Sequence, residues 1–159
     1  TPHPKFITIA TWVFPEYKGI MTVLAKTNYT NGQGEQYGLS LKELKPTFAI
    51  KRESGGKLGV GWQNVNSSST VPINQWSHLT ATWDGTAMKI YVNAELKNQN
   101  LKVPSGPIDN IIGGNLQIGR WLEQQPFRFK GKIDEIRVYN RALSSFEITT
   151  IYNLEKQIK

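Results

Sequence analysis

Apolar and polar residues alternate with a period of two along most of this chain, beginning at residue 6. In FITIATWVFP, residues 6–15, Ile7 and Ile9 fall on one face, and Thr8 and Trp12 fall on the other. Such alternation is typical of a β-strand, here with both faces at least partly covered. Turn residues interrupt the pattern roughly every eight to twelve residues, so about ten or eleven short strands are expected. Strands are predicted at 6–15, 20–26, 37–45, 48–51, 58–62, 76–84, 88–93, 96–103, 115–120 and 129–139.

Short turn and loop signals separate these strands. Asp84-Gly85 predicts a tight hairpin. Asn93-Ala94 occupies a similar position, where alanine with a positive φ angle costs on the order of 1 kcal/mol relative to glycine. Proline cannot donate to a central ladder, so the third strand is expected to end near Lys45-Pro46. The polar run 63–70, QNVNSSST, predicts a surface loop.

One helix is predicted near the end of the chain, from about Ser145 to Lys156. Ser144 and Glu147 form the pattern of a capping box, in which each side chain bonds the backbone of the other residue. Several apolar residues fall near helical spacing and predict one stripe that packs on a sheet. The stripe consists of Phe146, Ile148, Ile151, Tyr152 and either Leu154 or Glu155. The whole pattern predicts an all-β fold, an antiparallel two-sheet β-sandwich with one short C-terminal helix, as a single domain over residues 1–159.

Three large side chains fall on the strand faces that look away from this predicted core: Trp12, His78 and Tyr91. A curved sheet with a partly lined concave face would accommodate them. Two further tryptophans, Trp76 and Trp83, are interpreted, like Trp12, as core or sheet-lining residues.

Charge and composition narrow the classes of partner. Lys and Arg number 19 against 12 Asp and Glu, which gives a formal net charge of +7 and favours anionic partners. A scattered basic surface that only aids solubility is the alternative, because no long Lys/Arg block occurs. The absence of cysteine excludes disulfides and a cysteine nucleophile. No apolar run approaches the ~20 residues of a membrane span, so no membrane insertion is expected. The chain opens close to its first strand, and we expect it to be a module of a larger protein.

Three motifs carry a family resemblance: FITIATWVFP at 6–15, WSHLTATWDGTAMKIYVN at 76–93, and LQIGRW with FKGKIDEIRVYNRALSSFEI at 116–121 and 129–148. Over about residues 6–153 the chain resembles the laminin G-like, concanavalin A-like lectin/glucanase jelly-roll family. The resemblance implies one convex and one concave sheet, a noncatalytic glycan- or protein-binding role in secreted, multidomain proteins, and often a structural calcium ion. Two positions depart from the pattern: Ala10 stands where an acidic residue is frequent on the concave face, and Asn93-Ala94 replaces Asn-Gly. The strand that normally precedes the first motif is also missing.

Catalysis is not expected. Retaining glycoside hydrolysis needs two carboxylates about 5–5.5 Å apart, and the paired-acid strand motif of related glucanases does not occur. The only adjacent acids, Asp134 and Glu135, are predicted to point to opposite faces of a strand. There is no nucleophile elbow, no phosphate-binding loop and no histidine cluster. No nucleic-acid-binding motif occurs, so nucleic acid is not an expected partner.

By the resemblance, Asp134 is the candidate ligand of a structural calcium ion, with a loop carbonyl or Asp109 as weaker partners. Calcium takes six to eight oxygen ligands, so one carboxylate does not define a site. The alternative is structural: Asp134 accepts hydrogen bonds from backbone N–H groups, and Glu135 pairs with Arg137 or a lysine.

Sugar binding needs an aromatic face for the pyranose ring and planar donors for hydroxyls or carboxylates. Trp121 with Arg120, followed by Arg128, is the first candidate group, although Trp121 could equally belong to the core. Trp62, beside the faces cleared by Gly59 and Gly61, is the second. Tyr37 and Tyr29, in or near the first glycine-rich loop, complete the candidates.

We therefore expect a noncatalytic carbohydrate-binding module that holds a larger secreted or cell-surface protein on a polysaccharide, with the charge favouring an anionic one. Other domains of the same parent chain are expected partners. The alternative is a protein–protein adhesion or spacer domain that binds no glycan.

Overall fold

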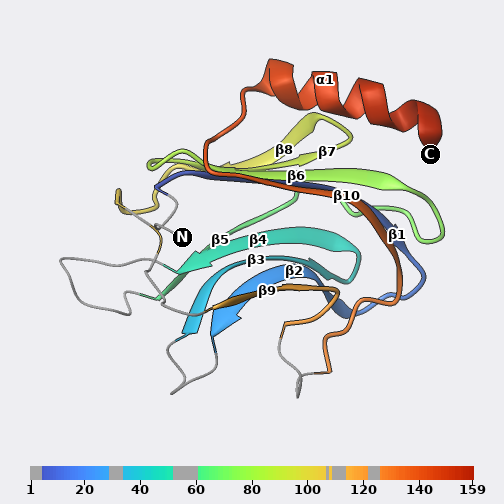
Figure 1. Ribbon diagram of the computed structural model, residues 1–159, viewed down its shortest axis with the longest axis horizontal. Coiled ribbons are helices and arrows are strands. Elements are labelled where there is room, and N and C mark those ends of the chain that lie inside the picture. The colour runs from blue at the N-terminus through green and yellow to red at the C-terminus, as the bar shows by residue number, and fades with distance from the viewer. Residues whose placement is uncertain (1–4, 29–33, 52–60, 107, 109–113, 122–125) are drawn as a thin grey trace.

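The computed structural model describes residues 5–28, 34–51, 61–106, 108, 114–121 and 126–159. Within these ranges the chain forms two five-stranded antiparallel sheets that face each other, with one helix outside them (Figure 1). Sheet A has the strand order β10-β1-β6-β7-β8 and sheet B the order β5-β4-β3-β2-β9. The predicted antiparallel sandwich with a C-terminal helix is confirmed.

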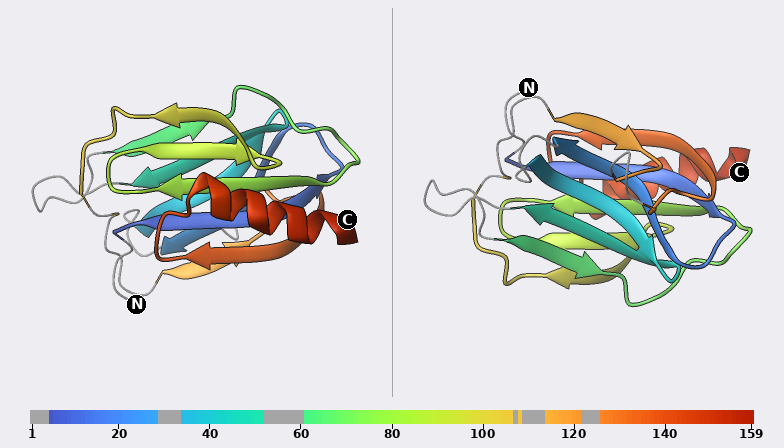
Figure 2. Two further views of the ribbon diagram at one scale, coloured as in Figure 1. Left: turned by 90° about the horizontal axis from the view of Figure 1, so that it is seen from above. Right: turned by 90° about the horizontal axis from the view of Figure 1, so that it is seen from below.

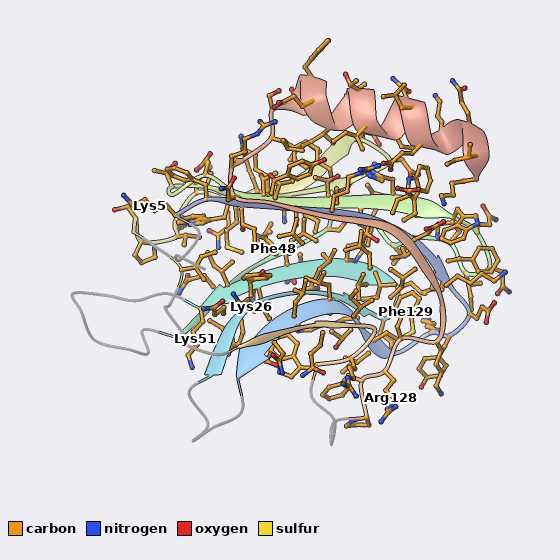
Figure 3. All side chains as sticks on the ribbon, in the orientation of Figure 1. Lys5, Lys26, Phe48, Lys51, Arg128 and Phe129 are labelled. Atoms are coloured by element: carbon orange, nitrogen blue, oxygen red, sulfur yellow. The ribbon has the colours of Figure 1, made fainter. Side chains whose placement is uncertain are left out.

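The strand bounds follow the alternation in the sequence. Sheet A contains β1 (Ile7–Pro15), β6 (Ser77–Trp83), β7 (Met88–Val92), β8 (Glu95–Asn100) and β10 (Gly131–Tyr139). Sheet B contains β2 (Ile20–Asn28), β3 (Gly34–Lys42), β4 (Lys45–Lys51), β5 (Trp62–Asn66) and β9 (Asn115–Ile118). The apolar faces of both sheets meet between them, where Phe48 and Trp83 are fully buried. Phe48 lies between the two layers in Figure 3.

Helix α1 (Ser145–Glu155), continued by the 3-10 turn η1 (Lys156–Ile158), covers the outer face of sheet A. Seen from above, it runs along β1 between β6 and β10 (Figure 2, left). Both bonds of the predicted capping box between Ser144 and Glu147 are present. The predicted apolar stripe was wrong at Phe146, which is 79% exposed. Ile148 is buried as predicted, and of the two alternatives at the end of the stripe Glu155 is buried and Leu154 is exposed. The helix is also held by polar contacts described below.

Two loop predictions were also wrong. Residues 63–66 belong to β5, which pairs with β4, and are not part of a surface loop. The third strand ends at Lys42, because Glu43 and Leu44 turn the chain with φ angles of 52° and 64°, and Pro46 lies inside β4. The Asn93-Ala94 hairpin is present, with φ angles of 51° and 65°. The predicted strand at 58–62 falls largely on residues outside the described ranges.

Candidate functional site

Within the described ranges the outer face of sheet B carries no helix, and the view from below looks onto this face (Figure 2, right). Its centre is a row of cross-strand partners with small side chains: Gly38 on β3 pairs with Ala25 on β2 and with Ala49 on β4. The row continues to Asn64 on β5 at one end and Gln117 on β9 at the other. Because side chains alternate along strands, these five positions share one face of the sheet. The middle of this face is therefore nearly free of side chains.

Trp121, which follows β9, covers the cleared centre of sheet B. A methyl group placed on Gly38 would overlap Cζ3 of the Trp121 ring and lie 3.1 Å from Cη2. The indole thus occupies the space that a side chain at position 38 would need. The hydroxyl of Thr27 donates a 3.3 Å hydrogen bond to the Trp121 carbonyl oxygen and fixes the backbone there.

Trp62, the first residue of β5, lies beside Trp121. The two ring centroids are 5.4 Å apart and the ring planes are inclined by 53°. Both residues are half-buried, so part of each remains exposed to solvent. We call Trp62 and Trp121 the tryptophan pair. Such half-exposed indoles present a polarisable face and one N–H donor, which suits stacking against an apolar ring face combined with a hydrogen bond.

Polar groups flank the tryptophan pair. The Oε1 atom of Gln117 is buried and has no hydrogen-bond partner within the described part of the chain. The strands of sheet B contain one acidic residue, Glu35, against four lysines: Lys26, Lys42, Lys45 and Lys51. None of these lysines forms an ion pair with a described residue. Several cations of β8, β10 and the helix region, in contrast, form ion pairs, such as Arg137 with Glu155 and Arg141 with Glu147.

The structure brings some of the predicted ligand residues together and separates others. Trp121 and Trp62 meet, and Arg120 directly precedes Trp121 and is half-buried. Arg128 is exposed and lies outside sheet B, whereas its neighbour Phe129 lies between the sheets (Figure 3). Gly59 and Tyr29 are outside the described ranges.

Tyr37 does not join this group. It is 5% exposed and packs in the core between the sheets. Burial raises its pKa to about 12, as expected for a phenol removed from water. Its neighbour Gly38 is the residue that contributes to the outer face, since adjacent strand residues point in opposite directions.

Asp134 lies on β10, and its carboxylate is committed to local partners. It forms an ion pair with Lys159 and accepts a 2.8 Å hydrogen bond from the backbone N–H of Glu135. These bonds hold the pKa of Asp134 below its ordinary value. No three His, Asp or Glu side chains within the described ranges lie close enough together to hold a metal ion. The described surroundings of Asp134 therefore do not fit a calcium ion; Asp109 lies outside them, and calcium binding stays a prediction.

The outer face of sheet A is closed by helix α1. The Glu155 carboxylate from the helix accepts 2.8 Å hydrogen bonds from Trp12 Nε1 and from Arg137 Nε. Tyr152 stacks on Trp12 with ring centroids 5.6 Å apart. The sequence placed Trp12, His78 and Tyr91 on a concave face, and the structure shows that the helix covers this face: the three residues are 3%, 0% and 6% exposed.

His78 lies beneath the helix, with its Nε2 atom 3.8 Å from Glu155 Oε2. Burial lowers its pKa from 6.5 to about 4; Glu155 acts against this shift and Arg137 adds to it. The imidazole is therefore neutral at pH 7, and its contact with Glu155 is not an ion pair at that pH.

An antiparallel two-sheet sandwich with aromatic side chains on one open face is the architecture of a lectin-like jelly-roll domain. The chain belongs to the concanavalin A-like lectin/glucanases superfamily: a laminin G-type family model with this description matches residues 2–149. Human usherin is 27% identical over 158 residues, which are 96% of this chain and 3% of usherin. The chain thus spans a small fraction of that relative's length.

Solved structures share the fold. CBM40 of the Ruminococcus gnavus IT-sialidase, bound to α2,3-sialyllactose, superposes with a TM-score of 0.75 at 19% identity over 92% of this chain and 82% of that one. Domain 4 of AbnA, a GH43 extracellular arabinanase from Geobacillus stearothermophilus, in complex with arabinotriose, gives 0.65 at 22% identity over 93% and 66%. No helix in the described ranges is long and apolar enough to cross a membrane.

Proposed function

We propose that this chain is a noncatalytic carbohydrate-binding module whose glycan lies on the outer face of sheet B, across the tryptophan pair. The observation that carries the proposal is the placement of Trp62 and Trp121 over a strand row cleared of side chains at Gly38. Stacking of a sugar ring on an indole needs such an accessible aromatic surface backed by a rigid sheet. The two structural neighbours described as glycan complexes support the same class of ligand.

The ligand class is an anionic polysaccharide. Lys42, Lys45 and Lys51 share the outer face of sheet B without described acidic partners, whereas Lys26, the cross-strand partner of Tyr37, lies on the inner face. A cationic face raises the local concentration of a polyanion and speeds its association. In the parent protein, the module would hold neighbouring domains on this polysaccharide outside the cell or at its surface.

A glycan array identifies a ligand, and calorimetry with that glycan then tests the site. Trp62→Ala and Trp121→Ala should each weaken binding by about 1–3 kcal/mol, or roughly 5- to 150-fold, without lowering the melting temperature in step. Gly38→Ala should also weaken binding, because the added methyl displaces the Trp121 ring. Phe146→Ala removes an exposed aromatic ring from the opposite side of the molecule and serves as the matched control. Equal affinities in all four variants would refute the proposed site.

The alternative function, a protein–protein adhesion or spacer domain, has one observation in its favour. Phe146, Leu154 and Ile158 are 79%, 70% and 70% exposed on the helix. An exposed apolar stripe of this kind is found where another surface docks. A glycan array without hits, together with a partner whose binding is lost in Phe146→Ala, would favour this function over glycan binding.

A further inference from the structure

A second group of cations lies away from the tryptophan pair, at the edge where sheet B passes into sheet A. In residues 126–132, PFRFKGK, exposed Arg128, Lys130 and Lys132 alternate with half-buried Phe127 and Phe129 and with Gly131. Successive cations lie two positions apart in the sequence, and therefore at most about 7 Å apart along the backbone. The segment places positive charges at short, regular intervals along one edge of the sandwich.

The backbone of this segment is held in place on both sides. The Thr22 amide donates to the Phe127 carbonyl at 2.8 Å, the Phe129 amide donates to the Gly119 carbonyl at 2.7 Å, and the Glu16 amide donates to the Lys130 carbonyl at 2.9 Å. Gly131 continues the segment into β10, and any larger residue there would overlap the carbonyl oxygen of Phe14. The spacing of the charges is thus fixed by the fold.

Each lysine of the edge stands over an aromatic ring. Lys130 Nζ is 4.2 Å from the centroid of the Tyr17 ring, and Lys132 Nζ is 4.9 Å from that of Phe14. Lys159, from the C-terminal end of the chain, is 5.0 Å from the Trp76 ring. An aromatic face restrains an ammonium group without neutralising it, and the N–H donors that point away from the ring stay available.

Phe14 and Trp76 are in edge-to-face contact, with centroids 5.6 Å apart, so Lys132 and Lys159 stand over adjoining rings. The Lys159 side chain is only 7% exposed and is paired with Asp134, so its charge is not available at the surface. The exposed charges of this edge are Arg128, Lys130 and Lys132, which we call the edge cations. Two acids lie nearby. Asp134 pairs with Lys159. Glu16, whose backbone amide donates to the Lys130 carbonyl oxygen, is exposed. Lys130 and Lys132 have no ion-pair partner among the residues that the structure describes.

We propose that the edge cations form a second binding site, specific for a linear anionic polysaccharide that carries sulfate or carboxylate groups. The site is independent of the tryptophan pair, because it lies on residues 128–132, which lead into β10, and uses none of the residues assigned to sheet B. A chain with repeated charges matches a row of cations along an edge. The rings at this edge are covered by the lysines, so they are not free to stack on nucleic-acid bases. A flat lipid surface would need cations spread over a face.

The test measures binding of heparin and of polygalacturonate to immobilised protein at several salt concentrations. Arg128→Gln, Lys130→Gln and Lys132→Gln together should reduce affinity on the order of tenfold or more and flatten its salt dependence. The matched control is the triple Lys5→Gln, Lys89→Gln and Lys102→Gln, which removes the same charge from positions outside both sites. Glu16→Gln should strengthen binding, because it removes the exposed acid beside Lys130; this gain cannot come from unfolding.

The outcomes separate this site from the proposed one on sheet B. Loss in the edge triple with little loss in Trp62→Ala supports an independent edge site, whether or not the glycan site on sheet B exists. Equal affinity of the edge triple and the wild type, or equal losses in the edge and control triples, overturns it. Weakened binding in Glu16→Gln also overturns it. Edge-dependent binding of duplex DNA or phosphatidylserine vesicles without binding of either polysaccharide would assign the edge to another class of partner and refute the proposal.

Discussion

We predict that the protein loses stability between pH 7 and pH 5 because of a single buried residue, His78. In the unfolded chain a histidine takes up a proton near pH 6.5, whereas burial beneath helix α1 lowers the pKa of His78 to about 4 in the folded protein. Between these values the unfolded state binds more protons than the folded state. Stability is therefore fully present above about pH 6.5 and falls as the pH is lowered toward 4.

The size of the effect follows from the two pKa values. The full difference of 6.5 against about 4 corresponds to about 3 kcal/mol of unfolding free energy, and the part lost between pH 7 and pH 5 is about 2 kcal/mol. Carboxylates contribute in a different range. Hydrogen bonds from Arg141 and Ser144 lower the pKa of Glu147 to about 2, so its contribution is lost mainly below pH 5. The window from pH 7 to pH 5 thus isolates His78.

Urea unfolding followed by tryptophan fluorescence, at constant ionic strength and at about pH 7, 6 and 5, measures this loss. His78→Gln is the control, because glutamine keeps polar atoms at the site and does not titrate. Its free energy of unfolding should stay nearly constant over the window. The second histidine, His3, is present in both proteins and cancels in the difference. A flat wild-type profile, or an equal slope in His78→Gln, would refute the burial of a neutral imidazole under the helix.

Two further predictions concern the helix start and the metal. Ser144→Ala removes the capping box and should lower the free energy of unfolding, measured in urea, by about 1 kcal/mol. Ser145→Ala, inside the helix, is the control. An equal loss in Ser145→Ala would contradict the capping role of Ser144. Calcium binding at Asp134 predicts that a chelator lowers the melting temperature of the wild type but not that of Asp134→Ala. An unchanged wild-type melting temperature would contradict the site and leave Asp134 with only its described partners, Lys159 and a backbone amide.

The fold could be predicted because its signals are local. Alternation, the Asp84-Gly85 hairpin and the Ser144–Glu147 capping box each depend on residues close in sequence. The errors arose where tertiary contacts determine the local structure. Pro46 was expected to end a strand, yet it lies inside β4. The turn lies instead at Glu43 and Leu44, which have positive φ angles although neither is a glycine or an asparagine, so the sequence carries no turn signal there.

The candidate site was predictable only in part. Trp62 and Trp121 were both proposed, but their contact depends on the position of β9 next to β2, which the sequence does not specify. Tyr37 was an avoidable error. It shares the alternation of Leu39 and Leu41, which indicated the core, while Gly38 on the opposite face carried the useful signal: a glycine inside a strand marks close approach of another group.

The surroundings of Ala10, where this chain departs from the family pattern, favour sheet B over sheet A as the face on which we propose that the ligand binds. Ala10 is the cross-strand partner of Arg137, and the carboxylate that Arg137 binds comes from Glu155 of the helix. The same carboxylate accepts from Trp12 Nε1, so the acid on this face serves to fasten α1. A glycan on the outer face of sheet A would have to displace the helix and leave a buried indole N–H without its acceptor, which alone costs about 1–3 kcal/mol. The outer face of sheet B requires no such rearrangement, since its strands already present small side chains and two accessible indoles.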